Sequence, residues 1–494
     1  MGEKFFIEVP AGFASRSQMS RLPGHARLDS YRERILNGPV LRTLLWLGLA
    51  PMVVQLVHVA YGVADSLWLS MYDEKAIAVP RQVFPVLMLF GAAVNALSAA
   101  GSAVLSQLVG ARAYDEVRVE ASRFFTASLT LGISLSTAFF LLRPLIFQHV
   151  VMTPREIFDY VMLYSAVMSL DSALMAAVMP LSTLLNSFGE TRAPSAINVA
   201  ALTVNIILDP FLVLGIGPFP RLGVVGASLT DVLGKVITLL GYRVLLRRRF
   251  GWLKLGLSFG FTAEWVRLVL GISSPVFVMM STNSLAFMLQ QRIVNMLGVT
   301  VATAYSIGFV VLDIADGMLW GLLGAISTMV GQSLGAGKAE RAREVALKAS
   351  AFIAAAVAAG AAFVYLFRVQ LVRVFASSPE VVEESVRFLE TILVGLPFFA
   401  IFMAGNSAGR GSGHTLVPTL IGMARLWLIR VVGSYVLAIQ LGMGSLGVWL
   451  AIMASNIVGG SLMLAWIAKG GWTKPVVRST VSVPARVGGA ATGT

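Results

Sequence analysis

The chain has 494 residues, of which 57% are hydrophobic and only 13% are charged, and its formal net charge is +13. A soluble domain carries about 25% charged residues, so this composition excludes an ordinary soluble protein. The charges stand in short clusters between long apolar runs, a pattern typical of a helical membrane protein with many spans.

The basic residues stand at the ends of the apolar runs and form no continuous stripe, which favours lipid headgroups over nucleic acid as their partners. The chain has no cysteine, so disulfides and thiol catalysis are excluded. It has no GxxxxGK(S/T), HExxH or GxSxG motif, which argues against ATP drive and against a membrane hydrolase. We therefore expect neither enzyme activity nor an organic cofactor.

The apolar runs predict an all-α integral membrane protein with twelve transmembrane helices. A span requires about 20 apolar residues, and each run reaches that length. The predicted spans cover roughly residues 40–71, 76–109, 117–146, 155–186, 193–216, 222–248, 264–297, 299–333, 341–370, 379–411, 416–440 and 444–469.

Orientation is predicted from lysine and arginine, which are more frequent on the cytoplasmic side of a membrane. The loops with Arg112, Arg249 and Lys338 fall on the same side as the arginines near the start of the chain. We expect this side to be cytoplasmic in the plasma membrane. Residues 1–38 would then be a basic cytoplasmic tail, and residues 471–494 a C-terminal cytoplasmic tail.

The chain contains an internal repeat. Gly189-Glu-Thr-Arg-Ala-Pro194 matches Gly413-His-Thr-Leu-Val-Pro418 at an offset of 224 residues, and Pro51 matches Pro275 at the same offset. Each copy holds six spans, an even number, so the two copies insert in the same orientation as parallel repeats around a central cleft.

The repeat predicts two six-helix lobes with a short connection. We expect an N-lobe over residues 39–248 and a C-lobe over residues 264–470, joined by a linker over residues 249–263. Trp252, Leu253, Leu255 and Leu257 in this linker suggest a helix lying along the membrane surface.

The first span carries one acid, Asp65. An acid inside the bilayer costs on the order of 3 kcal/mol, so it is a functional-site hypothesis by default. Tyr61 and His58 share its helix face, although a neutral packing role is the more ordinary reading of His58. Pro51 removes a backbone hydrogen bond and predicts a hinge further down the same helix.

Spans five and six bring polar residues to the depth of Asp65. Asn205 and Asp209 are four residues apart and share a helix face, and Thr230 follows in the next span. At about 1.5 Å per residue, Asp65, Asp209 and Thr230 lie about 9, 10 and 12 Å inside the outer ends of their helices. Two carboxylates, an amide and a hydroxyl can bind a hard cation or share protons.

The second copy has no such set. At the offset of 224, the counterparts of Asp65, Asn205, Asp209 and Thr230 are Leu289, Ile429, Gly433 and Ala454. We therefore expect a cation site in the N-lobe alone.

Ordinary structural roles compete with this interpretation. Asp65 could reach toward the outer surface, Asn205 and Asp209 could clamp two helices, and Thr230 could bond its own backbone. Asp171, Asp231, Asp313 and Asp316 are further acids within spans, and Asp171 lies at the depth of Lys235, with which it could pair.

Across residues 40–470 the chain resembles the MATE family of multidrug exporters, including its archaeal members. The resemblance rests on the following motifs in order: Pro51, Tyr61 and Asp65; Gln107-Leu-Val-Gly110 and Gln332-Ser-Leu-Gly335; Gly189–Pro194; Asn205–Pro210; Gly223–Thr230; Arg410-Gly411; and Arg430. It implies cation-coupled export of amphipathic, often cationic small molecules by alternating access. It also implies H⁺ or Na⁺ coupling at Tyr61, Asp65, Asn205, Asp209 and Thr230, with Pro51 as the bending residue and a monomeric protein.

One departure from the family bears on the C-lobe. Other members carry acids in spans seven and ten, where this chain has Gln290, Gln291 and an apolar stretch near Phe399. The alternative function is a lipid-linked-oligosaccharide flippase or polysaccharide exporter. A flippase would need several basic residues in its cleft, and Arg292 and Arg410 are the main candidates.

Overall fold

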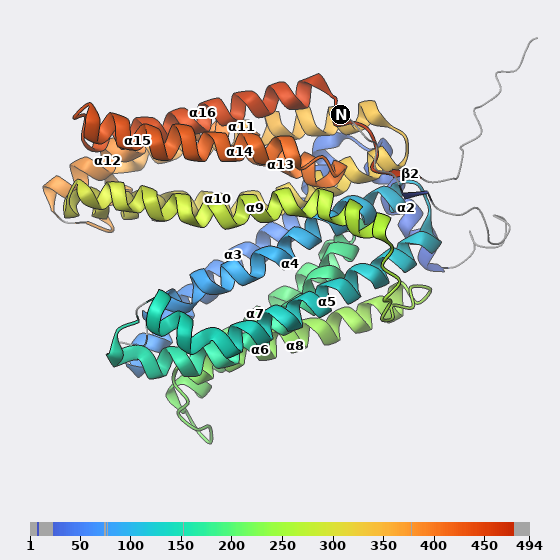
Figure 1. Cartoon of the computed structure of the whole chain (residues 1–494), viewed down its shortest axis with the longest axis horizontal. Helices are drawn as coiled ribbons and strands as arrows, with labels where there is room; N and C mark the ends of the chain where they lie inside the picture. The colour runs from blue at the N-terminus through green and yellow to red at the C-terminus, as the bar shows by residue number, and fades with distance from the viewer. Residues whose placement is uncertain are drawn as a thin grey trace, which may run out of the picture.

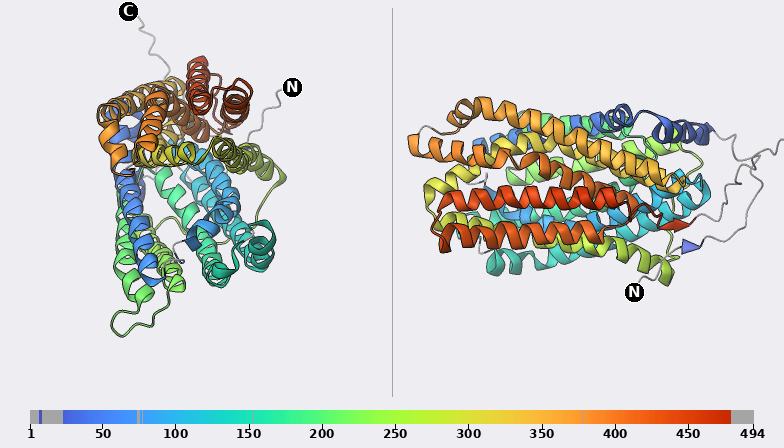
Figure 2. Two further views of the ribbon diagram at one scale, coloured as in Figure 1. Left: turned by 90° about the vertical axis from the view of Figure 1, so that its left-hand side faces the viewer. Right: turned by 90° about the horizontal axis from the view of Figure 1, so that it is seen from above.

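A computed structural model of the chain is almost entirely helical (Figure 1). It describes residues 7–8, 23–73, 76, 78–151, 153–376 and 378–478. The expected basic tail and C-terminal tail therefore lie partly outside the described residues. The long helices run along one common direction, as a view from above also shows (Figure 2).

The helices fall into two groups, which we call the N-lobe and the C-lobe. The N-lobe contains α3 (Val40–Tyr72), α4 (Ala78–Gly110), α5 (Tyr114–Leu145), the π-helix η1 (Ile146–Val150), α6 (Arg155–Ser187), α7 (Arg192–Leu214) and α8 (Val224–Arg249). The C-lobe contains α9 (Ala263–Met296), α10 (Val299–Gly335), α11 (Ala339–Arg373), α12 (Pro379–Leu393), α13 (Leu396–Ser412), α14 (Leu416–Ala424), the π-helix η2 (Arg425–Val432), α15 (Gly433–Tyr435), the π-helix η3 (Val436–Gln440) and α16 (Ser445–Lys469).

These helices are built to stand in lipid. Within the described residues, ten are long and apolar enough to cross a membrane, and the pair α12–α13 makes an eleventh span if taken together. The remaining long helix, α10, has 37 residues. Large apolar side chains such as Leu141, Leu240 and Leu366 are exposed on the outside, where lipid rather than water would cover them. The prediction of an all-α, twelve-helix membrane protein is confirmed.

Three local features differ from or add to the expected pattern. The span predicted over residues 379–411 is bent, because Gly395 and Pro397 interrupt the hydrogen-bond ladder and α12 and α13 meet at 52°. The expected surface helix is not formed over residues 250–262, since three glycines break the pattern and the backbone amide of Ser258 donates to Thr126 Oγ1 at 2.8 Å. Within the expected basic tail, residues 23–37 form the helix α2 (Pro23–Asn37), which contacts α3 and α4 of the N-lobe and α10 of the C-lobe.

The lobes converge at one end of the molecule, which we call the base, and diverge toward the other end (Figure 1). Two glutamines join them at the base. Gln107 Nε2 of α4 donates to the carbonyl of Ser412 at 3.1 Å, and Gln332 Nε2 of α10 donates to the carbonyl of Ser187 at 2.6 Å. Both side chains are fully buried. Gln107 therefore gives a C-lobe carbonyl, and Gln332 an N-lobe carbonyl, a hydrogen-bond donor that it would otherwise lack.

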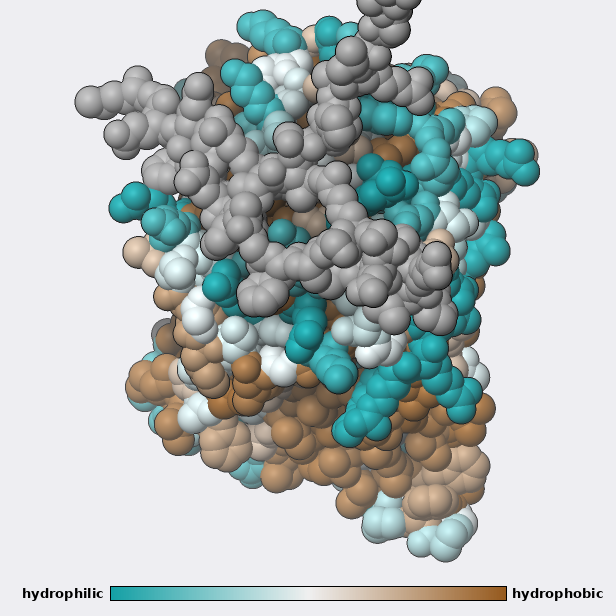
Figure 3. All heavy atoms as spheres, turned by 90° about the vertical axis from the view of Figure 1, so that its right-hand side faces the viewer, coloured by the Kyte–Doolittle hydropathy of each residue, from teal (hydrophilic) through white to brown (hydrophobic). Residues whose placement is uncertain are grey.

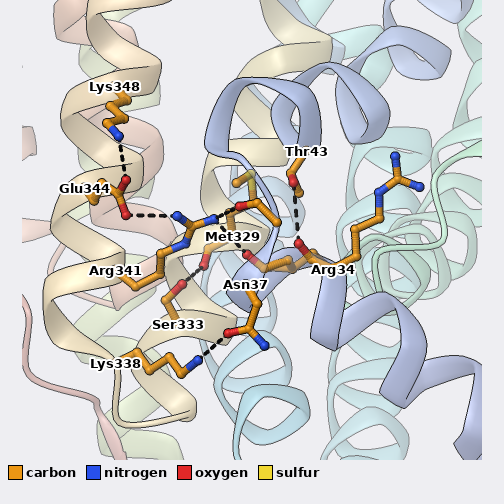
Figure 4. Close-up of polar contacts among 11 residues, drawn as sticks. Arg34, Asn37, Thr43, Met329, Ser333, Lys338, Arg341, Glu344 and Lys348 are labelled. Carbon is orange, nitrogen blue, oxygen red and sulfur yellow. Dashed lines mark hydrogen bonds and ion pairs between the residues drawn. The ribbon is translucent and has the colours of Figure 1, made fainter.

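The base is also crossed by segments from both ends of the chain. The two-residue strands β1 (Ile7–Glu8) and β2 (Val477–Arg478) pair in parallel, and Gln107 Oε1 accepts from the amide of Val477 at 3.1 Å. Helix α2 contacts the N-lobe where Arg32 Nε donates to the carbonyl of Gly110 at 2.8 Å. It is bound to the C-lobe helix α11 where Lys338 donates to Asn37 at 2.6 Å and Arg341 donates to the carbonyl of Gly38 (Figure 4). Viewed onto this end, hydrophilic residues gather over the base and apolar residues cover the flank (Figure 3).

The close crossing of α4 and α10 at the base leads to a prediction. A Cβ atom at Gly335 would run into the backbone carbonyl of Gln107, and one at Gly110 into that of Gln332. We expect Gly335→Ala to force the helices apart and to lower the free energy of unfolding by about 1–3 kcal/mol, the usual cost of overpacking. Thermal unfolding of the purified protein measures this. Gly324→Ala, in the same helix, is the control for a lost glycine, because nothing lies near a Cβ there. An unchanged unfolding temperature for Gly335→Ala would contradict the prediction.

Candidate functional site

The interior of the N-lobe holds a polar cluster on α3, α7 and α8. Helix α7 packs between α3 and α8, which brings its acid Asp209 against both neighbours. Asp209 and Thr230 are fully buried, and Thr230 Oγ1 donates to Asp209 Oδ1 at 2.5 Å. The hydroxyl of Thr230 also lies 2.6 Å from the carbonyl of Ala227, so it is within hydrogen-bonding distance of its own helix backbone as well.

Helix α3 adds two side chains to this cluster. The hydroxyl of Tyr61 donates to Asp231 Oδ1 on α8 at 2.9 Å, and Tyr61 is only 7% exposed. One turn further along α3, Asp65 lies within electrostatic reach of both Asp209 and Asp231. His58 does not join them, since it is exposed, and its ring centre lies 6.1 Å from that of Tyr61.

Asp231 is a residue that the sequence indicated only as one of several acids within spans. The available signal was its position next to Thr230, because adjacent residues of a helix lie at nearly the same depth. The structure shows that it is the hydrogen-bond acceptor of Tyr61, so the cluster contains three carboxylates, Asp65, Asp209 and Asp231.

Three buried oxygen atoms in the cluster have no hydrogen-bond donor. They are Asp65 Oδ1, Asn205 Oδ1 and Asp209 Oδ2. Asn205 is 2% exposed and packs against Gly234, where the missing side chain leaves room for the amide. A buried acceptor without a donor raises the free energy of the folded protein, and a proton or a cation bound among these oxygens would lower it. We name Tyr61, Asp65, Asn205, Asp209, Thr230 and Asp231 the N-lobe polar cluster.

The three carboxylates of the N-lobe polar cluster are not arranged as a metal-ion site. Among the described residues, no group of three or more His, Cys, Asp or Glu side chains is arranged to hold a metal ion. A ligand at the cluster would therefore be surrounded by mixed carboxylate, amide and hydroxyl oxygens, a set suited to a proton or to a hard monovalent cation.

A second polar group lies deeper in the N-lobe. Lys235 Nζ of α8 lies 3.2 Å from Asp171 Oδ1 of α6, so the pairing that the sequence left open is present. Asp231 also interacts electrostatically with Lys235, which links this ion pair to the N-lobe polar cluster. The side chains of Asp313 and Asp316 lie outside the described residues.

The ion pair yields a test of structural role. Asp171→Leu removes the nearest carboxylate of Lys235 and should lower the free energy of unfolding by about 1–2 kcal/mol, because the partly buried ammonium keeps only the more distant charge of Asp231. The double variant Asp171→Leu, Lys235→Leu removes both charges and should recover part of the loss, since Asp231 then loses its positive neighbour. Thermal unfolding of both proteins decides the matter. A double variant no more stable than the single one would show that the pair is not the cause.

The C-lobe has a neutral polar pair in the matching place. Gln290 of α9 and Ser434 of α15 are fully buried, and Gln290 Nε2 donates to Ser434 Oγ at 3.1 Å. The adjacent Gln291 turns the other way and donates to Asn295 at 2.8 Å. At the offset of 224 the counterparts of Asp65 and Asp209 are Leu289 and Gly433, and the polar pair stands one residue further along in each helix.

For Ser434 the reason is a change of register between the two copies. Gly189 and Gly413 both have φ of +81°, at the offset of 224. The next matching glycines, Gly223 with φ of 58° and Gly444 with φ of 61°, are only 221 residues apart. The π-helices η2 and η3 and a shorter loop in the C-lobe shift the alignment between these points. The C-lobe pair still contains no carboxylate.

Comparison with known proteins identifies the fold and its family. The family model MatE matches residues 51–211 and 275–436, one stretch in each lobe. The chain belongs to the MatE family. Members of this family are transporters and not enzymes.

Relatives of the chain within the MatE family include named transporters. A probable multidrug resistance protein NorM of Thermotoga maritima is 26% identical over 446 residues, covering 88% of this chain and 94% of the relative. A FAD transporter of Shewanella oneidensis is 25% identical over 443 residues, covering 87% and 94%. The multidrug export protein MepA of Staphylococcus haemolyticus is 21% identical, covering 80% and 87%. These relatives do not favour the alternative of a flippase.

Solved structures of MATE proteins share the fold. An outward-facing multidrug resistance MATE transporter superposes with a TM-score of 0.81 at 21% identity, covering 88% of this chain and 97% of that chain. A MATE protein in its bent conformation gives a TM-score of 0.80 at 21% identity, and one in its straight conformation gives 0.79 at 20%.

Proposed function

We propose that this chain is a cation-coupled antiporter that exports amphipathic, often cationic, small molecules by alternating access, with H⁺ or Na⁺ bound at the N-lobe polar cluster. The observation that carries the proposal is the set of unpaired buried oxygens, Asp65 Oδ1, Asn205 Oδ1 and Asp209 Oδ2. They come from two helices, α3 and α7, so a bound cation would hold these helices together. The multidrug relatives support the substrate class.

The coupling mechanism follows from the charges. With the site empty, Asp65, Asp209 and Asp231 repel one another across α3, α7 and α8. A proton or Na⁺ removes that repulsion and favours close packing of α3 on α7. A bulky cationic compound competes for the same negative charge, so each ligand weakens the binding of the other, as linkage requires. Exchange of the two ligands would drive export.

The base is assigned to the cytoplasmic side of the plasma membrane. Basic residues gather there, and the positive-inside tendency favours this orientation. Arg32, Arg112, Arg249, Lys338 and Arg341 lie at this end of the helices. Both termini are then cytoplasmic, residues 39–248 and 264–470 are the lobes, and the arrangement closed at the base is open to the outside. We infer a monomer whose partners are small molecules and membrane lipids.

The test is transport in reconstituted vesicles. Vesicles that hold the protein and a fluorescent cationic dye are given an inward gradient of Na⁺ or of H⁺, each in a separate experiment. We expect one gradient to accelerate dye movement and a vesicle without protein to show none. Equal dye movement with and without either gradient would contradict the proposed coupling.

A further inference from the structure

The interior of the C-lobe holds two arginines on the π-helix η2. Arg425 is 8% exposed and Arg430 is 5% exposed, so both charges are removed from solvent. Buried arginines in proteins are usually paired with carboxylates. Among the described residues, neither guanidinium forms an ion pair with an acid.

The contacts of these arginines leave several donors free. Arg425 Nη1 donates to Asn456 Oδ1 of α16 at 3.0 Å, and its guanidinium carbon lies 4.2 Å from the ring centre of Phe402. The guanidinium carbon of Arg430 lies 5.0 Å from the ring centre of Phe287, and Tyr305 also bonds it. Arg425 Nε, Arg430 Nε and Arg430 Nη2 are buried and have no acceptor.

Aromatic faces compensate only part of this charge. A ring face attracts a desolvated cation less strongly than removal of an unpaired charge from water disfavours it. The unpaired N–H groups also require acceptors, which the rings supply only weakly. An anionic group would satisfy both the charge and the donors.

Packing alone does not explain the arginines. The matching N-lobe helix α7 has no basic residue after Arg192 at its start. In each lobe a glycine of the last helix makes room for a polar side chain of the preceding helix: Gly234 for Asn205, and Gly459 for Arg425. The C-lobe thus retains the space but fills it with a cation. The π-helix that carries both arginines is of a kind often found at functional sites.

We propose that Arg425 and Arg430 form a binding site for an anionic group, a carboxylate or a phosphate, of the transported compound. The site rests on the proposed export function and adds to its substrate class. Ser434 lies one turn beyond Arg430 and, with Gln290, supplies further hydrogen-bonding groups. The ring of Phe287, which is 43% exposed, lies over the guanidinium of Arg430 and shields it from the exterior.

With this site, the two lobes would bind ligand groups of opposite charge. The N-lobe polar cluster holds unpaired acceptors and binds positive charge, whereas the arginines hold unpaired donors and bind negative charge. A compound that carries an anionic group can then bind the C-lobe without displacing the coupling cation. Anionic substrates would show weaker competition with the cation than cationic ones.

The test uses two flavins that differ by one phosphate group. Riboflavin is uncharged, and flavin mononucleotide carries the same ring with a phosphate. Quenching of flavin fluorescence measures binding to the full-length protein in nanodiscs of phosphatidylcholine. We expect the nucleotide to bind at least tenfold more tightly than riboflavin. Arg430→Gln should remove that difference, and Arg430→Lys should retain part of it.

Controls separate the site from general effects. Arg292→Gln, at an exposed arginine of the same lobe, should leave the preference for the nucleotide intact. Phe287→Ala keeps both arginines and should raise the association rate constant of the nucleotide, which tests the site even if Arg430→Gln fails to fold. Equal binding of the two flavins by the wild type, or no binding of the nucleotide, overturns the proposal.

Two further results decide between related explanations. If added phosphatidylglycerol displaces the nucleotide, a lipid headgroup occupies the site, and its assignment to transported compounds is wrong. If the cationic dye shows no coupled transport while the nucleotide preference holds, the proposed coupling fails and the anion site stands. If dye transport is coupled and the two flavins bind alike, the anion site alone is rejected.

Discussion

Replacing Asp209 with asparagine is expected to reduce gradient-driven efflux by at least about 100-fold. The amide cannot release or bind a proton, and it offers a cation a dipole in place of a full charge. Because Thr230 donates to Asp209 Oδ1, the amide oxygen can keep this bond and the helix packing should survive. Asp65→Asn should have a similar effect, since Asp65 Oδ1 is one of the unpaired acceptors. Efflux rates from vesicles measure both.

Two controls define what the loss means. Asp115→Asn changes an exposed acid at the start of α5 and should transport at the wild-type rate. Gln291→Ala should alter the range of transported compounds more than the dependence on the cation, since Gln291 bonds Asn295 outside the N-lobe polar cluster. Wild-type rates for both Asp65→Asn and Asp209→Asn would exclude a coupling role. Loss of coupling in Gln291→Ala but not in Asp65→Asn would place the cation in the C-lobe.

The sequence predicted those features that depend on local pattern. Apolar runs gave the twelve-helix fold because each span must be apolar along its own length, whatever its neighbours. Helical periodicity put Asn205 and Asp209 on one face, and depth put Asp65 and Thr230 at the same level. The structure brings these residues together on α3, α7 and α8, although their role in binding a cation stays a prediction.

Features that depend on packing between distant segments were not predictable. The contacts of α2 with Gly110 and with α11 join residues far apart in the chain, and nothing in its basic composition signals them. The π-helices η2 and η3 add residues without interrupting the apolar pattern, so the shift that brings Gln290 to Ser434 was invisible. The bond from Tyr61 to Asp231 depends on the same kind of helix placement.

The hinge in α3 has a place in the structure that suits bending. Pro51 lies within the continuous helix α3, where its ring cannot donate to the carbonyl of the preceding turn. Around it, α3 lies so close to α10 that a side chain at Gly48 would meet Leu322, and one at Gly321 would meet Met52. The part of α3 around Pro51 is therefore held against the C-lobe helix α10. The half that carries Asp65, about 21 Å further along, packs on α7 of the N-lobe.

A helix whose two halves pack on different lobes can take two packings that differ by a few kcal/mol. Binding of a cation at Asp65 would favour one packing, and binding of the exported compound would favour the other. Pro51→Ala restores the missing hydrogen bond and should stiffen the helix. We expect transport to fall by about tenfold while equilibrium binding of the compound is kept. Pro210→Ala, in α7, is the control for loss of a proline from a neighbouring helix.

The decisive measurement compares binding with and without saturating cation in the wild type and in Pro51→Ala. If bending couples the two ligands, the cation weakens compound binding in the wild type by the same factor as the compound weakens cation binding. In the stiffened variant this factor should approach one, because α3 no longer changes its packing. A variant that transports normally would show that Pro51 is no hinge. A wild type whose compound affinity ignores the cation would show that α3 does not link the two sites, since a ligand shifts a two-state helix only through its differential affinity for the two states.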